Sequence, residues 1–169
     1  MHKTEAGGIR LGLHTPDDVR QAFGEVTNNA LEYDRNATID GALVQQMITG
    51  GVETIVGVSY DSQLGPVLLF GTGGVMVEIY NDVALRLCPI NREDALEMIG
   101  EVKGVGLLRG FRGAPPADID ALADVLVSVS QMAVSLEGRL TELDINPLMV
   151  LQAGQGVVAA DALAVLADQ

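Results

Sequence analysis

The middle of the chain has several strand patterns in succession, and this grouping narrows the possible folds. Alternating or continuous apolar residues predict strands at residues 52–61, 66–74 and 83–90. Helical patterns follow at residues 91–102 and 116–136, before a further strand pattern at residues 141–151. A doubly wound parallel sheet would alternate strands with helices, so strands grouped in this way predict an α+β fold.

Fewer helices and strands are predicted for the segment before residue 50. "GGIRLGL" at residues 7–13 and "ALVQQMI" at residues 42–48 each predict a short strand. Between them we expect a helix that begins after Thr15, a favourable N-cap residue. The glycines of "TGG" mark a soft boundary, so we expect one domain at residues 1–50 and a second at residues 51–169.

Charge and composition argue against several classes of partner. The net charge is −13, with 10 Lys and Arg against 23 Asp and Glu, so nucleic acid and anionic membranes are not expected partners. We find no signal-peptide pattern and no run of about 18 apolar residues that could span a membrane. Cys88 is the single cysteine and cannot form an internal disulfide. These features predict a cytoplasmic protein.

The stretch "ELDINPL" places oxygen-bearing side chains in a row. At strand spacing Glu142, Asp144 and Asn146 share one face, and a short turn could bring Asp161 opposite Asn146. Carboxylate and amide oxygens are the ligands that Mg²⁺ prefers, with positions left for phosphate oxygens and water. A solvated strand face would show the same spacing, so both interpretations stay open on this pattern alone.

A second candidate lies around the glycine pair. A strand entering a hinge would expose backbone groups beside an apolar floor, which suits a purine ring, and Glu53 could then accept hydrogen bonds from ribose hydroxyls. The exposed backbone groups would lie beside Met47 and Ile48. The alternative is a core strand that ends in a turn.

Two further residues have charges or chemistry that their surroundings leave unexplained. His2, in "HKTEAGG", could act as a nucleophile, a general base or a phosphoryl carrier, or could be idle at the start of the chain. Arg86 lies in the apolar stretch "VALRLCPI", where a charge must pair or point into a cleft. Pairing with Asp82 is one interpretation, and binding of a phosphate or acyl-phosphate oxygen is the other.

Taken in order, these stretches resemble the ATP-grasp domain of NDP-forming (ADP-forming) acyl-CoA synthetases, which also occurs in the synthetase-like region of large bacterial protein acetyltransferases. A more distant resemblance is to the beta subunit of succinyl-CoA synthetase. The similar pieces are "HKTEAGGIRLGL", "LVQQMITGGVETIVG", "DSQLGPVLLFGTGGVMVEIYNDVALRLCPI", "LLRGFRG", and "ELDINPLMVL" followed by "GVVAADAL". They cover nearly the whole chain.

The resemblance implies a role for each candidate residue. Asn146 and Asp161 match residues that hold magnesium on the nucleotide phosphates, with Asp144 at the acidic position of the same motif. Glu53 matches the ribose acid, and the segment from Gln45 to Ile48 matches the adenine hinge. His2 matches the histidine of the HKT motif, which relays a phosphoryl group between a partner domain and the nucleotide.

The reaction implied joins a carboxylic acid to coenzyme A while ATP becomes ADP and phosphate, through acyl-phosphate and phosphohistidine intermediates. The implied cofactors are ATP and Mg²⁺, and the implied partners are CoA-binding and acyl-binding domains or a subunit of the same synthetase. The family has further elements before "HKT", so we expect a complete C-terminal lobe and a truncated N-terminal lobe. The isolated chain should then bind nucleotide weakly or not at all and catalyse no turnover.

An alternative of another class is a noncatalytic module that retains the ATP-grasp fold. Such a module would use exposed apolar strand edges to self-associate or to dock a partner.

Overall fold

The computed structural model describes residues 7–74, 81–136 and 138–167. The chain divides into two compact units, residues 1–49 and residues 50–169. The assignment of these units to two ATP-grasp lobes remains a prediction. Among the described residues, no helix combines the length and the apolar character that a membrane crossing requires.

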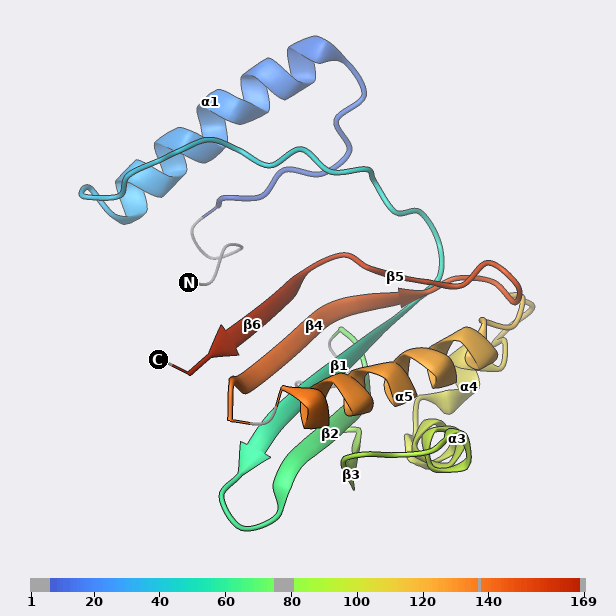
Figure 1. Ribbon diagram of the computed structural model, residues 1–169. Helices are drawn as coiled ribbons and strands as arrows, with labels where there is room; N and C mark the ends of the chain where they lie inside the picture. Colours follow the sequence, from blue (N-terminus) through green and yellow to red (C-terminus); the bar gives the residue numbers. More distant parts are fainter. Residues whose placement is uncertain (1–6, 75–80, 137, 168–169) are drawn as a thin grey trace. The chain divides into compact units, whose positions relative to one another are not determined.

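The second unit is built on one antiparallel sheet (Figure 1). Its strands are β1 (Val52–Asp61), β2 (Gly65–Thr72), β3 (Val83–Leu87), β4 (Leu140–Val150), β5 (Val157–Ala159) and β6 (Ala162–Leu166). The spatial order is β3-β2-β1-β4-β5, and β6 also pairs with β4. The expectation of an α+β fold is therefore confirmed, and all four expected strands of this unit are present, although β2 and β3 end before the expected residues 74 and 90.

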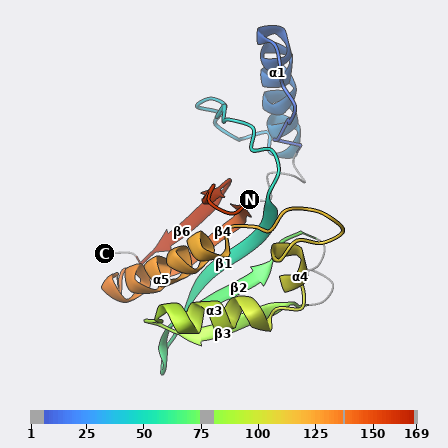
Figure 2. The ribbon, with the colours of Figure 1, turned by 90° about the vertical axis from the view of Figure 1, so that its right-hand side faces the viewer.

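Helices cover one face of this sheet (Figure 2). They are α3 (Arg92–Glu101), the short α4 (Val105–Leu108) and α5 (Ile119–Ser135). Buried side chains of the strands, such as Leu68 and Phe70, pack with Met98 of α3 and Leu126 of α5 in one core. The face is chosen by the sequence period, because alternate residues of β1 and β2 are buried.

The opposite face of the sheet is not covered by the helices of this unit. Alternate residues of β3 therefore remain exposed there, including Leu85 at 54% and Leu87 at 50%, and so does Leu163 of β6 at 60%. The polar row of β4 lies on this same face, because Asp144 pairs with Leu163 and paired residues of neighbouring strands point to the same side. We call this surface the open face.

The first unit contains α1 (Pro16–Tyr33), which begins where the sequence predicts. The Thr15 side chain accepts a hydrogen bond from the Asp18 N–H, and the Asp18 carboxylate accepts one from the Thr15 N–H, which completes a capping box. The strands expected at residues 7–13 and 42–48 are absent, so these two predictions were wrong. A strand requires a paired neighbour, and neither segment has one among the described residues.

Candidate magnesium and nucleotide site

The polar row of β4 lies on the open face because its neighbours are turned into the core. Leu140, Leu143 and Leu148 are buried under the helices, whereas Asp144 and Asn146 are exposed. Across the ladder, Asp144 pairs with Gly57 of β1. Since Gly57 has no side chain, the β1 residue that pairs with Asp144 places nothing beside its carboxylate.

Asp161 is brought to this row by the pairing of β4 with β6. The Asn146 N–H donates to the Asp161 carbonyl oxygen at 3.1 Å, and Ile145 pairs with Ala162. The Asp161 carboxylate accepts a hydrogen bond from the Ala162 N–H at 3.0 Å. Backbone pairing therefore fixes Asp161 next to Asn146, although 15 positions separate them in the sequence.

Negative charge is concentrated at this point of the open face. Partial burial of its carboxyl group raises the pKa of Asp144, and the nearby carboxylates of Glu142 and Asp161 raise it further. Among the described residues, no basic side chain forms an ion pair with Asp144. A divalent cation bound here would relieve this repulsion, so the donor set fits Mg²⁺.

Carboxylates alone do not complete such a site. No group of three His, Cys, Asp or Glu side chains within the described part of the chain is arranged to hold a metal ion. The third protein donor of the predicted set is the amide oxygen of Asn146, which is not of these types. Phosphate oxygens and water would supply the remaining positions of an octahedral Mg²⁺.

A pocket of about 320 Å³ lies at the start of β1. We call it the Glu53 pocket, and its lining residues are Gly51, Val52, Glu53, Gly73, Leu107, Phe111 and Ala114. Its walls are mainly apolar, and among the described residues that line it Glu53 is the only acid. The backbone fixes one wall, because the Gly73 N–H donates to the Glu53 carbonyl oxygen at 2.8 Å. An apolar pocket with one carboxylate suits a ligand that has a flat apolar part and hydroxyl donors.

The comparisons with known proteins agree with this architecture. A family model described as an ATP-grasp domain matches residues 1–166. The chain belongs to the ATP-grasp family. It is 40% identical over 166 residues to the beta subunit of acetate–CoA ligase [ADP-forming] I of Pyrococcus furiosus, covering 98% of this chain and 70% of the relative. It is 44% identical over 158 residues to acetate–CoA ligase [ADP-forming] I of Archaeoglobus fulgidus, covering 94% of this chain.

The ATP-grasp chain spans only 23% of the length of that Archaeoglobus ligase. Among solved structures, it is similar to dinucleotide forming acetyl-coenzyme A synthetase 1 of Ca. Korarchaeum cryptofilum, which was solved in complex with coenzyme A, Ca-AMPCP and HgCl+. The TM-score is 0.92 at 39% identity, over 98% of this chain and 71% of the other. A structure of the same synthetase with Mg-AMPPCP gives a TM-score of 0.84 at 36% identity, over 99% of this chain and 71% of the other.

The remaining predicted site residues of the ATP-grasp chain are placed differently. His2 lies outside the described residues. Gln45, Gln46, Met47 and Ile48 belong to a segment without helix or strand at the end of the first unit, and Met47 is 53% exposed. Their role as an adenine hinge stays a prediction, as do the ligand roles of Glu53, Asp144, Asn146 and Asp161.

Arg86 has a different partner from the one considered. Its guanidinium pairs with the Glu101 carboxylate of α3, and Glu97 lies 3.8 Å away, whereas Asp82 is not a partner. The interpretation of an Arg86–Asp82 pair was therefore wrong. Four positions of an extended strand span about 13 Å, so the two side chains are too far apart to pair. Because Glu101 already neutralises Arg86, its binding of a phosphate oxygen remains a prediction without support from this geometry.

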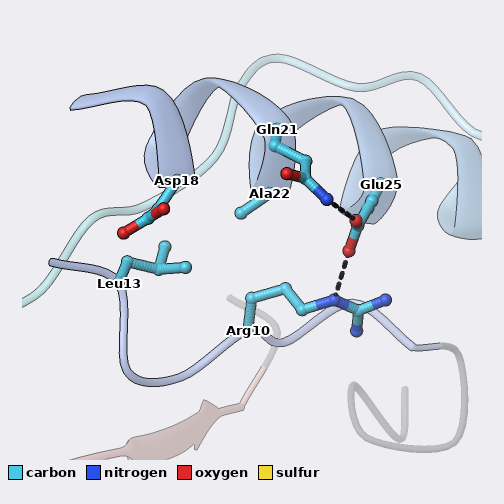
Figure 3. Close-up of a pocket in the computed structure, with 6 residues that line it drawn as sticks. All are labelled: Arg10, Leu13, Asp18, Gln21, Ala22 and Glu25. Carbon is cyan, nitrogen blue, oxygen red and sulfur yellow. Dashed lines mark hydrogen bonds and ion pairs between the residues drawn. The ribbon is translucent and has the colours of Figure 1, made fainter. Parts of the chain in front are cut away.

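The first unit has a smaller pocket of about 180 Å³ (Figure 3). Arg10 reaches from the segment before α1 to Glu25, and its Nε donates to Oε2 at 2.7 Å. Gln21 donates to the other oxygen of Glu25 at 2.9 Å (Figure 3). These polar groups satisfy one another, so we assign the pocket to the packing of the segment against α1.

The structure also contains a residue that sequence reasoning did not select for a role of its own. Asp82 is only 5% exposed, yet its carboxylate accepts hydrogen bonds from the Thr72 hydroxyl and from the N–H groups of Lys103 and Gly104. Burial raises the pKa of Asp82, but these hydrogen bonds together outweigh it, so the net pKa is lowered. The only sequence signal was an acid directly before an apolar strand.

Proposed function

We propose that the chain is the nucleotide- and magnesium-binding part of an acid–CoA ligase. The enzyme would make acyl-CoA from a carboxylic acid, CoA and ATP, with release of ADP and phosphate. The observation that carries the proposal is the β4–β6 pairing, which brings Asp144, Asn146 and Asp161 together on the open face. The 40% identity to a beta subunit of an ADP-forming acetate–CoA ligase supports the reaction class.

Asp144, Asn146 and Asp161 would hold the phosphate end of the nucleotide through the bound Mg²⁺. Asp144 and Asp161 would supply carboxylate oxygens, and Asn146 would supply its amide oxygen. When bound there, Mg²⁺ neutralises charge on the transferring phosphoryl group. The absence of a side chain at Gly57 would leave room for the ion and the phosphates next to Asp144.

The ribose would lie at Glu53, farther along the open face from the magnesium ligands. Alternate residues of β1 are buried, so Glu53 and Gly57 share the open face. Four strand positions, about 13 Å, separate them, so a ligand that contacts both ends must be elongated, as a nucleoside triphosphate is. Glu53 would accept hydrogen bonds from the ribose hydroxyls, and the segment from Gln45 to Ile48 would contact the base.

His2 would relay the phosphoryl group. An imidazole nitrogen of His2 would attack the phosphorus of a phosphohistidine presented by a partner domain or subunit, forming a P–N bond as the donor P–N bond breaks. ADP would then attack that phosphorus through a terminal oxygen, giving ATP and free His2, and the ligase direction reverses both steps. The isolated chain would catalyse no turnover, because the acyl- and CoA-binding parts must come from elsewhere in the synthetase.

Thermal unfolding in the presence of MgATP tests this proposal. A ligand that binds only the folded state raises the unfolding temperature, by the equivalent of about 1.4 kcal/mol at ten times its Kd. We expect a rise with MgATP that EDTA abolishes and that is lost in Asn146→Ala. Asn36→Ala, on an exposed residue of the first unit, is the matched control. The proposed nucleotide and magnesium ligands all belong to this chain, so the proposal requires weak binding and not its absence, and no rise at millimolar MgATP would overturn it.

A second candidate function rests on the exposed apolar residues of the open face, Leu85, Leu87 and Leu163. A noncatalytic module could self-associate or dock a partner through them. A stable dimer in light scattering, together with no response to MgATP, would favour this candidate over the ligase.

A further inference from the structure

Asp82 is a buried charge that the proposed chemistry does not use. Its Oδ1 accepts a hydrogen bond from the Lys103 N–H at 2.7 Å, and its Oδ2 accepts one from the Gly104 N–H at 2.8 Å. The Thr72 hydroxyl donates to the same Oδ2 at 3.0 Å. An ionised carboxylate is costly to bury unless donors surround it, and here three donors do so.

These contacts join segments that are distant in the sequence. Thr72 ends β2, Asp82 precedes β3, and Gly104 is the residue before α4. The approach is close, because a Cβ on Gly104 would lie 2.3 Å from Cγ2 of Thr72. Gly104 has an ordinary φ of −73°, so only this contact, and not backbone strain, prevents a side chain there.

The same segments form both walls of the Glu53 pocket. Gly73 follows Thr72 directly and is hydrogen-bonded to the Glu53 backbone. On the other side, Leu107 belongs to α4, and Phe111 and Ala114 follow it. The bonds of Asp82 to Thr72 and Gly104 therefore fix the distance between the wall at Gly73 and the wall at Leu107.

The geometry points to Asp82 and Thr72 as positioning residues that set the width of the Glu53 pocket and thereby the affinity for the nucleotide. This inference rests on the proposed function, because it takes the ligand of the pocket to be a nucleotide. Neither residue lines the pocket, so they act through Gly73 and α4 and not by contact with the ligand.

Two alanine substitutions within seven residues of Phe111 test the role. Gly104→Ala removes none of the groups that donate to Asp82 but forces α4 away from Thr72, whereas the added methyl group of Gly106→Ala, within α4, enters open space. We expect Gly104→Ala to weaken MgATP binding to the 169-residue chain about five-fold, the factor that corresponds to about 1 kcal/mol. Gly106→Ala should leave the Kd within about two-fold. Calorimetric titration measures both.

A second pair of variants, at Thr72, distinguishes a positioning role from a general loss of stability. Thr72→Val removes the hydroxyl at similar size and should weaken MgATP binding, and Thr72→Ser should restore it. Ser130→Ala removes another buried hydroxyl, which bonds Ile90 and Val127 in the core, and should lower the unfolding temperature without changing the Kd. This rescue pattern would not arise from a purely structural role.

The outcomes separate the two ideas. Equal Kd values for Gly104→Ala and Gly106→Ala, or for Thr72→Val and Thr72→Ser, overturn the positioning role. If the unmodified chain does not bind MgATP, the proposed function itself fails, and the inference fails with it.

Discussion

Asp82 and Asp144 are acids of the same sheet in opposite circumstances. Asp82 is buried and fully bonded, and its pKa is lowered. Asp144 is exposed on the open face beside Glu142 and Asp161, and its pKa is raised. The fold thus places its hydrogen-bond donors around one carboxylate and leaves the other facing like charges. An acid that destabilises its own fold is a good candidate for a ligand-binding role, because a cation would reverse the penalty.

The largest expected effect is that of Asp82→Asn. The variant cannot satisfy the two backbone N–H groups and the Thr72 hydroxyl as an ionised carboxylate does, so it should lose about 2 kcal/mol of the free energy of unfolding. Urea denaturation at pH 7 measures the loss. A variant as stable as the parent chain would show that the hydrogen bonds of Asp82 contribute no net stability.

Acidification should distinguish the two acids by the sign of their effects. The folded-state pKa of Asp82 lies below the ordinary value of 3.8, so its contribution is present above pH 3.8 and is lost as the pH falls through the folded-state pKa. Asp144 has a raised folded-state pKa, so its ionised carboxylate destabilises the fold. This destabilisation is full above the folded-state pKa and disappears as the pH falls toward 3.8.

Unfolding curves of the parent chain and of each Asn variant between pH 3 and pH 7 would show these differences. The destabilisation by Asp82→Asn should persist to about pH 4, whereas any stabilisation by Asp144→Asn should already have faded there. Parallel pH profiles for the two variants would contradict this assignment.

Asp144→Asn should produce a smaller change in the opposite direction. Removing one of the facing charges should raise the stability of the ligand-free chain at pH 7 by about 0.5 kcal/mol, or about 1–2 °C in Tm. The same variant should lose the response to MgATP. A destabilised variant would mean that Asp144 is structural and is not held ready for a cation.

Glu142→Gln should have the smallest effect. It removes one of the two carboxylates that raise the pKa of Asp144, so that pKa should move down. Carbon-detected NMR titration of the Asp144 carboxyl measures the shift, with Glu93→Gln on α3 as the control. An unchanged Asp144 pKa would show that burial and the Asp161 carboxylate raise it without a contribution from Glu142.

The sequence predicted what depends on local periodicity. The α+β class, the start of α1 at its capping box and the polar row of β4 all follow from patterns within a few residues. The expected strands at residues 7–13 and 42–48 failed because a strand also needs a partner, which a local pattern does not supply. Arg86 was paired with the wrong acid for the same reason, since the Glu101 side chain reaches it from a helix packed against β3.

The hydrogen bonds of Asp82 could not be predicted from the sequence, because they link it to residues 10 and more than 20 positions away. Only the fold shows that Thr72 and Gly104 meet. The proximity of Asp161 to Asn146 was foreseeable because a short turn follows β4 and Asp161 lies just beyond it, after β5. The metal itself remains a proposal that the binding experiments must test.

Gly57 is a position at which a label can be attached next to the polar row of β4. A Cβ there would lie 3.4 Å from the Leu143 carbonyl oxygen and 3.7 Å from Leu69 Cβ, which are ordinary contacts. The sheet can therefore accept a cysteine at that position, next to Asp144. A small fluorophore coupled to this cysteine would report whether a cation is bound beside Asp144. A bulkier label would cover the carboxylates and block cation binding.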